Sequence, residues 1–129
     1  MSRPKSKNRH MRVETGNLNT ENSEYPARKG WVVGDLVPEM SLMHSDDVSL
    51  KWVTHAKGTK KSSGADLDTE TRTITLLLSG SWLTRFSGDG KAIILSTPGD
   101  YLTYEGAALH ENEALEESRL IVFRWTERR

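Results

Sequence analysis

The stretch TRTITLLLSGSWLTRFSGDGKAIIL, residues 71–95, carries the strongest structural signal in the sequence. Apolar and β-branched residues dominate it, and the run is interrupted at Ser79 and Gly80. A second interruption contains Asp89 and Gly90, a pair that is typical of a tight hairpin turn. The stretch therefore predicts β-strands joined by short turns.

Similar segments occur on both sides of this stretch. They are short, rich in β-branched or aromatic residues and bounded by turn residues: GWVVGDLV at 30–37, DVSLKWVTH at 47–55, DYLTY at 100–104 and SRLIVFRWT at 118–126. Only LHENEALEES, at 109–118, has a helix-like composition, and it is short and uncapped. Many short strands without a long helical period favour an all-β antiparallel barrel or sandwich.

Length and composition narrow the possibilities further. The chain has 129 residues, which fits one domain, and we expect that domain to span residues 26–129. It contains no cysteine, which excludes disulfides and thiolate metal sites and favours a reducing, cytoplasmic location. Lysine plus arginine equals aspartate plus glutamate, 18 of each, so no overall charge favours a polyanion or an anionic membrane as partner.

The first 25 residues differ from the rest of the chain. They open with MSRPKSKNRHMR, which is basic, and continue as a polar run without the apolar stretch of a signal peptide or membrane anchor. Such a composition predicts a flexible tail over residues 1–25. A basic arm can contact nucleic acid, but no interleaved aromatic and basic residues follow it, so nucleic acid is not an expected partner.

Alternation along residues 71–78 predicts two unlike faces. Thr71, Thr73 and Thr75 share one face of the strand, and Ile74 and Leu76 share the other, because successive side chains point to opposite sides. A sandwich would bury the apolar row and solvate the threonines. A barrel with a ligand cavity would turn the threonines inward and cover the apolar row with a partner.

Two motifs resemble those of the cupin family. PGDYLTYEGAALH, residues 98–110, matches the family's second motif in the spacing from Gly99 to His110, and Gly80 in LLLSGSW is the counterpart of the glycine that ends the first motif. The similarity runs from Gly30 to Thr126. It implies an all-β double-stranded β-helix, a jelly-roll barrel, with a pocket between the motifs and frequent dimers built by edge strands and outer faces.

The second motif departs from the family pattern in minor ways. Glu105 stands where the turn proline is usual, and Gly106 comes one place early. Ala114 occupies the usual asparagine position, with Asn112 nearby. His110 is retained, and by this resemblance it lies at the mouth of the barrel.

The first motif lacks the family's metal ligands. By the same alignment Thr73 replaces the glutamate, and Asp66 and Asp68 replace the two histidines. The resemblance therefore implies a metal-free or weakly metal-binding protein. An alternative site for iron, manganese or zinc would use Asp66, Asp68 and His110, although the two aspartates fit equally well as solvated residues of a polar loop.

The candidate ligand-binding residues lie on the predicted strands. His55 shares a strand face with Lys51 and Val53, and this face either lines a pocket or meets solvent. The full candidate set is His110, Thr73, Thr75, His55, Tyr104 and Glu105.

Three functions follow from these residues. The first is a metal-free cupin that binds a small metabolite in the barrel. The second is a metal-dependent dioxygenase or isomerase that uses the aspartates and His110. The third is a metal-free sugar epimerase or isomerase, with His110 or His55 as base and Glu105 or Tyr104 as acid. The sequence contains no G-x-S-x-G elbow, P-loop or dinucleotide-binding motif.

The sequence also predicts a homodimer. If the threonines face inward, a large apolar surface is left outside the barrel. We expect it to contain Ile74, Leu76 and Leu78, together with Ile93 and Leu95, and a second copy of the chain would cover it.

Overall fold

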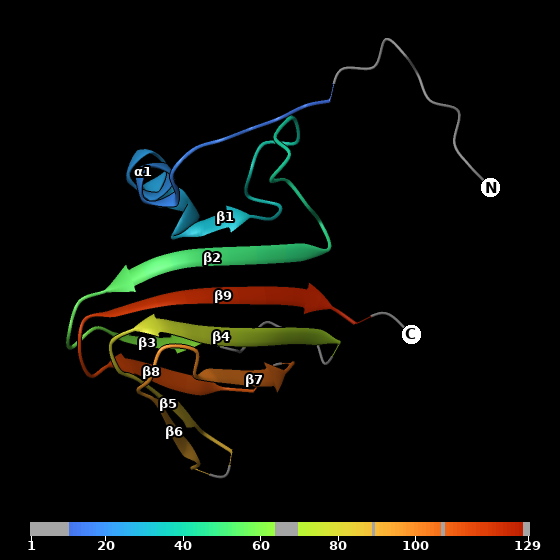
Figure 1. The fold of residues 1–129 in the computed structure, drawn as a ribbon. Helices are drawn as coiled ribbons and strands as arrows, with labels where there is room; N and C mark the ends of the chain where they lie inside the picture. The colour runs from blue at the N-terminus through green and yellow to red at the C-terminus, as the bar shows by residue number, and fades with distance from the viewer. Residues whose placement is uncertain (1–10, 64–69, 89, 107, 128–129) are drawn as a thin grey trace.

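Two antiparallel sheets form the body of the protein. The computed structural model describes residues 11–63, 70–88, 90–106 and 108–127. One sheet has five strands in the order β1 (Trp31–Val33), β2 (Val48–His55), β9 (Ser118–Thr126), β4 (Thr71–Ser79) and β7 (Tyr101–Glu105) (Figure 1). The other has four, in the order β3 (Lys60–Ser63), β8 (His110–Ala114), β5 (Trp82–Phe86) and β6 (Ala92–Leu95).

The two-sheet architecture confirms the expected all-β jelly roll. The segment of helix-like composition is a strand, β8, since it pairs with β5 from Trp82–Ala114 to Phe86–His110. The strand β3 was not anticipated; its polar sequence, KKSS, gives no strand signal.

The core lies between the two sheets and fixes which strand faces point inward. Its buried members come from both sheets: Leu77, Trp82, Leu95, Leu102, Ala114 and Leu120. The threonine face of β4 is also buried, with Thr73 1 % and Thr75 7 % exposed, so the barrel alternative with threonines inside is correct. Our placement of Ile93 and Leu95 on the outer surface is wrong, because Leu95 is in the core and Ile93 packs against it.

Gly80 makes the tight passage from one sheet to the other, between β4 and β5. Its φ of +97° is in the region that favours glycine. A Cβ at this position would collide with the carbonyl oxygen of Glu117 and would lie 2.7 Å from Cα of Ser118. Only glycine therefore fits where this turn crosses the start of β9.

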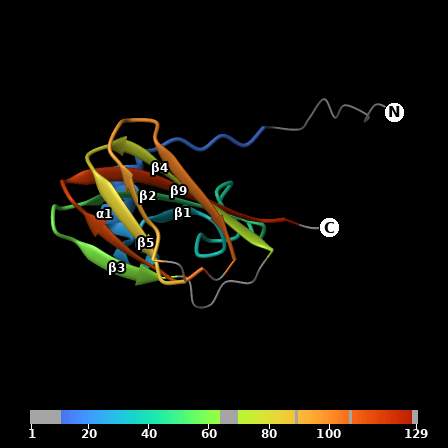
Figure 2. The same ribbon diagram turned by 90° about the horizontal axis from the view of Figure 1, so that it is seen from below.

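The N-terminal region is more structured than the expected tail. Helix α1 (Leu18–Glu24) begins at Asn17, whose side chain accepts hydrogen bonds from the backbone, and a short 3₁₀ helix, η1 (Pro26–Arg28), follows. The helix lies beside β1 in both views (Figure 1, Figure 2). It is joined to β2, because Trp52 Nε1 donates to Asn19 Oδ1 at 2.8 Å. The segment proposed as a tail therefore contains a helix, and its first ten residues lie outside the described part of the chain. The domain boundary at residue 26 stays a prediction.

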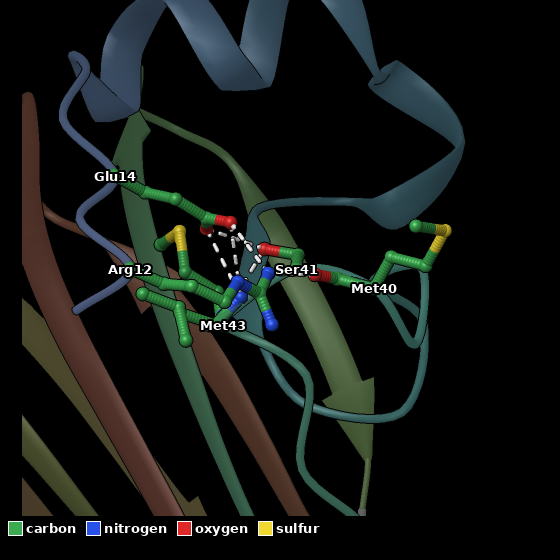
Figure 3. A network of polar contacts seen from close by, with 6 residues as sticks. Arg12, Glu14, Met40, Ser41 and Met43 are labelled. Atoms are coloured by element: carbon green, nitrogen blue, oxygen red, sulfur yellow. Dashed lines mark hydrogen bonds and ion pairs between the residues drawn. The ribbon is translucent and has the colours of Figure 1, made fainter. Parts of the chain in front are cut away.

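A polar network joins the segment before α1 to the loop between β1 and β2 (Figure 3). The Glu14 carboxylate accepts hydrogen bonds from Ser41 Oγ at 2.9 Å and from the backbone N–H of Leu42 at 3.0 Å. Arg12 donates to the backbone carbonyl of Met40. Among the described residues, no helix is long and apolar enough to cross a membrane.

Candidate functional site

A cavity of about 270 Å³ opens between the two sheets. Strands of both sheets contribute to its wall, together with a tryptophan from β1. The lining residues are Trp31, Lys51, Val53, His55, Lys61, Ser62, Thr75, Trp82, Thr84, Tyr104, His110, Asn112, Leu120, Val122 and Arg124.

Tyr104 of β7 and His110 of β8 come from opposite sheets and meet at this cavity. His110 is 4 % exposed, and its Nδ1 lies 2.7 Å from the carbonyl oxygen of Ala108. That carbonyl can only accept, so Nδ1 carries a proton, and in the neutral imidazole Nε2 is the acceptor. Tyr104 Oη lies 3.3 Å from Nε2 and donates to it. The imidazole is therefore held in one tautomer and one orientation.

Burial controls the protonation of Tyr104. Removal of the phenol from water raises its pKa, and the positive charge of Arg124 and a hydrogen bond with Thr73 partly offset that rise. The phenol therefore stays protonated at neutral pH and continues to donate. The ring of Phe86 packs edge-on against that of Tyr104, with centroids 5.7 Å apart.

His55 lies on the wall formed by β2 and stacks on Trp82. The two ring centroids are 5.1 Å apart and the planes differ by 20°. Burial and, to a smaller extent, the positive charges of Lys61 and Lys51 together lower the pKa of His55 to about 4. His55 is therefore a neutral imidazole at pH 7.

Three cationic side chains also line the cavity. Lys51 comes from β2, Lys61 from β3 and Arg124 from β9. Burial, followed by the nearby positive charges of Lys61, Arg124 and Lys29, lowers the pKa of Lys51 to about 8. The guanidinium of Arg124 lies 4.8 Å from the centroid of the Trp31 ring, at cation–π distance.

The structure brings together four of the six candidate ligand-binding residues. His55, Thr75, Tyr104 and His110 all line the cavity, whereas Thr73 is buried without lining it. His110 is the first residue of β8.

Glu105 does not lie in the cavity. It pairs with Arg72 across β7 and β4, and the Arg72 Nε to Glu105 Oε2 distance is 3.8 Å. The Glu105 side chain is 69 % exposed. Its expected role as a ligand-binding residue or acid is therefore corrected, because strand alternation turns it to the outer face while Tyr104 turns inward.

The described residues do not form a metal site. Among residues 11–63, 70–88, 90–106 and 108–127, no three His, Asp or Glu side chains gather closely enough to hold an ion. Among the described residues, the ring nitrogens of His110 lie near the Ala108 carbonyl and the Tyr104 phenol. Asp66 and Asp68, the other candidate ligands, lie outside the described residues.

The sequence analysis placed Lys51 on the strand face of His55 but left open whether that face lines a pocket, and it did not identify Arg124 or Lys61. The alternation that places His55 inside also places Lys51 inside, and the same alternation along β9 groups Arg124 with the lining residues Leu120 and Val122. That signal was present in the sequence. Lys61 could not be found in this way, because its strand was not recognised.

Comparisons with known proteins identify the fold. No protein-family model and no curated protein matches the sequence. A cupin superfamily protein from Desulfitobacterium hafniense DCB-2 is similar in structure, with a TM-score of 0.56 and 23 % identity over 68 % of this chain and 75 % of that one. KdgF from Halomonas sp. has a TM-score of 0.51 and 22 % identity over 67 % and 74 %.

A third solved structure has the same architecture. It is a protein with a double-stranded β-helix domain from Klebsiella pneumoniae, with a TM-score of 0.53 and 14 % identity over 64 % of this chain and 66 % of that one. The chain therefore has the cupin fold, a double-stranded β-helix, as its motifs suggested.

Proposed function

We propose that this small cupin-fold protein binds a small molecule in the cavity between its sheets and does so without a resident metal ion. The observation that carries the proposal is the Tyr104–His110 pair, in which buried polar groups are held in fixed orientations on a cavity wall. Ligand pockets of this kind combine a few fixed polar groups with aromatic walls, here Trp31 and Trp82.

A metal-free isomerase or epimerase is the second candidate. It is supported by the neutral imidazole of His55, which can accept a proton at pH 7, and by the protonated phenol of Tyr104, which can donate one. Glu105 takes no part in this version because it faces outward. A metal-dependent enzyme would need Asp66 and Asp68 to complete a ligand set around His110.

A thermal-shift screen of small metabolites on protein dialysed against a chelator tests the proposal. We expect a ligand that raises the melting temperature of the wild type but not of His110→Ala. Glu105→Ala is the matched control and keeps the response, since Glu105 lies outside the cavity. Elemental analysis of untreated protein completes the test, and one tightly bound iron, manganese or zinc per chain would contradict it.

We also propose that the chain forms a homodimer through the outer face of the five-stranded sheet. Apolar residues lie in register across three strands of this face, with Leu50 opposite Phe123 and Phe123 opposite Ile74. In the next row Ile121 stands between Trp52 and Leu76. All of these are half-buried in the single chain, and a second copy would cover them about a twofold axis.

The location of the protein in the cell stays a prediction. The absence of cysteine from the sequence fits the reducing cytoplasm that we expected.

A further inference from the structure

We propose that the ligand of the cavity is a small anion, a carboxylate or phosphate compound, held by Lys51, Lys61 and Arg124. This inference rests on the proposed function, because it assigns a chemical class to the molecule bound in the same cavity. Carboxylates and phosphates share the anionic oxygens that ammonium and guanidinium groups recognise.

The three cations converge although they come from three strands in two sheets. Lys51 and Arg124 lie on neighbouring strands, β2 and β9, where Lys51 pairs with Val122, two residues before Arg124. Lys61 lies on β3 in the opposite sheet. Lys61 and Arg124 both act electrostatically on Lys51, so the positive charges lie around one space.

The described part of the chain supplies no negative charge to this space. The lining residues include no aspartate or glutamate, and none of the ion pairs among the described residues involves Lys51, Lys61 or Arg124. Bringing like charges together with partial burial is unfavourable unless an opposite charge joins them. An anion in the cavity would supply that charge.

Arg124 provides a hydrogen-bond donor for such an anion. Its Nε–H is buried, and among the described residues none accepts a hydrogen bond from it. The guanidinium plane is held over the Trp31 ring, which limits its movement. A bound carboxylate or phosphate oxygen would satisfy the buried N–H and gain a charge-assisted hydrogen bond.

Neutral groups of the cavity can contact the rest of the ligand. Thr84 Oγ1 donates to Asn112 Oδ1 at 2.8 Å, which fixes the amide and leaves the Asn112 NH₂ as a donor. Trp82, stacked on His55, and Trp31 offer ring surfaces. An anion that also has a small polar or planar organic part fits this surface best.

An NMR titration tests the inference with three probes: inorganic phosphate, succinate and the neutral analogue succinamide. We expect phosphate and succinate to shift the side-chain N–H resonances of Arg124 and Trp31 in a saturable manner, and succinamide to leave them unchanged. The affinity for succinate should fall as sodium chloride is added, because salt screens the attraction.

Lys61→Gln and Lys60→Gln form a matched pair of variants. Both lysines are exposed residues of β3 and are therefore tolerant of substitution, but of the two only Lys61 lines this cavity. We expect Lys61→Gln to weaken succinate binding about tenfold, the loss typical of one charge-assisted contact, and Lys60→Gln to have little effect. Lys51→Met serves as a second variant and should weaken binding at least as much.

Proton uptake gives an independent readout. An anion next to Lys51 raises the pKa of that amine, so succinate binding at pH 8.5 should take up part of a proton, measured by calorimetry in buffers of different ionisation enthalpy. Lys51→Met should remove the uptake. The titratable and charged groups around Lys51 are Lys29, His55, Lys61, Tyr104, His110 and Arg124.

Two outcomes of these experiments would contradict the anion inference. If succinamide shifts the same resonances as strongly as succinate and Lys61→Gln binds normally, the cavity binds a ligand but not through anion recognition. If neither phosphate nor succinate shifts them at millimolar concentration, the anion inference fails, and the thermal-shift screen decides separately whether the cavity binds any small molecule.

Discussion

Tyr104 and His110 belong to opposite sheets, yet the phenol oxygen of one lies 3.3 Å from Nε2 of the other. The ring centroids are 4.9 Å apart in an edge-on arrangement. This contact joins β7 to β8 across the interior, so the side chains that shape the cavity also connect its two walls. The proposed ligand binding therefore depends on the same pair that joins the two sheets.

Tyr104→Phe should lower the free energy of unfolding by about 1 kcal/mol, the usual net contribution of one buried hydrogen bond. The aromatic ring and its packing against Phe86 are kept, so only the hydroxyl contact with His110 and Thr73 is lost. Urea denaturation measures the change. Tyr101→Phe is the control, because Tyr101 lies on the same strand but is 61 % exposed; equal losses in both variants would contradict the role of the contact.

The stability of the protein should fall as the pH drops from about 6.5 to about 4. The pKa of His55 is about 4 in the folded chain and 6.5 in a solvated one, so the unfolded state binds more protons in this range. The loss is on the order of 3 kcal/mol. His55→Phe keeps a ring against Trp82 and removes the titration, so its profile should be flatter. Parallel profiles for the two proteins would show that His55 is not the titrating group.

Stability should rise between about pH 8 and pH 9.5. The pKa of Lys51 is about 8 in the folded chain and 10.5 when solvated. Between these two values the unfolded state binds more protons than the folded state, so the free energy of unfolding increases with pH. Because Lys51 is partly exposed, we expect a gain on the order of 1 to 2 kcal/mol. Lys51→Met should be more stable than the wild type at pH 7 and show no such gain. A Lys51→Met variant that is less stable than the wild type at pH 7 would contradict the account of uncompensated charge.

Leu76→Lys should convert the dimer to a monomer while the barrel stays folded. The substitution places a charge in the middle of the outer apolar rows, where a second copy would have to desolvate it. Light scattering after size-exclusion chromatography gives the mass, and circular dichroism checks the fold. Ala92→Lys, at an exposed position of β6 in the other sheet, is the control. A monomeric wild type at micromolar concentration would refute the dimer.

The strands that could be predicted from the sequence are those in which apolar and polar residues alternate, because one face of each strand is buried. A period of two groups the β4 threonines on one face and His55 with Lys51 on another, but it leaves open which face points inward. The structure turns both faces inward, and the turn at Gly80 follows from the glycine that its φ requires. By contrast, β3 and β8 have polar sequences. They form strands because β8 pairs with β3 on one side and with β5 on the other. Such pairing joins residues distant in the chain and leaves no local pattern.

Part of the candidate site was predicted from strand alternation alone, as for His55, and part from alternation combined with a motif. His110 and Tyr104 were found in this way, whereas Glu105, one residue further along β7, faces outward. The anchoring of α1 to β2 was also missed, because it depends on a tertiary contact between Trp52 and Asn19. The three cationic side chains of the cavity come from three strands in two sheets, so their proximity is visible only in the folded structure.

A crystal structure of the protein grown with saturating succinate tests the central claim most directly. The account predicts succinate inside the cavity, with one carboxylate oxygen about 2.7 to 3.2 Å from Nε of Arg124 and the ammonium groups of Lys51 and Lys61 directed toward that carboxylate. Succinate bound only outside the barrel, with the cavity occupied by a metal ion or closed by its own side chains, would contradict it.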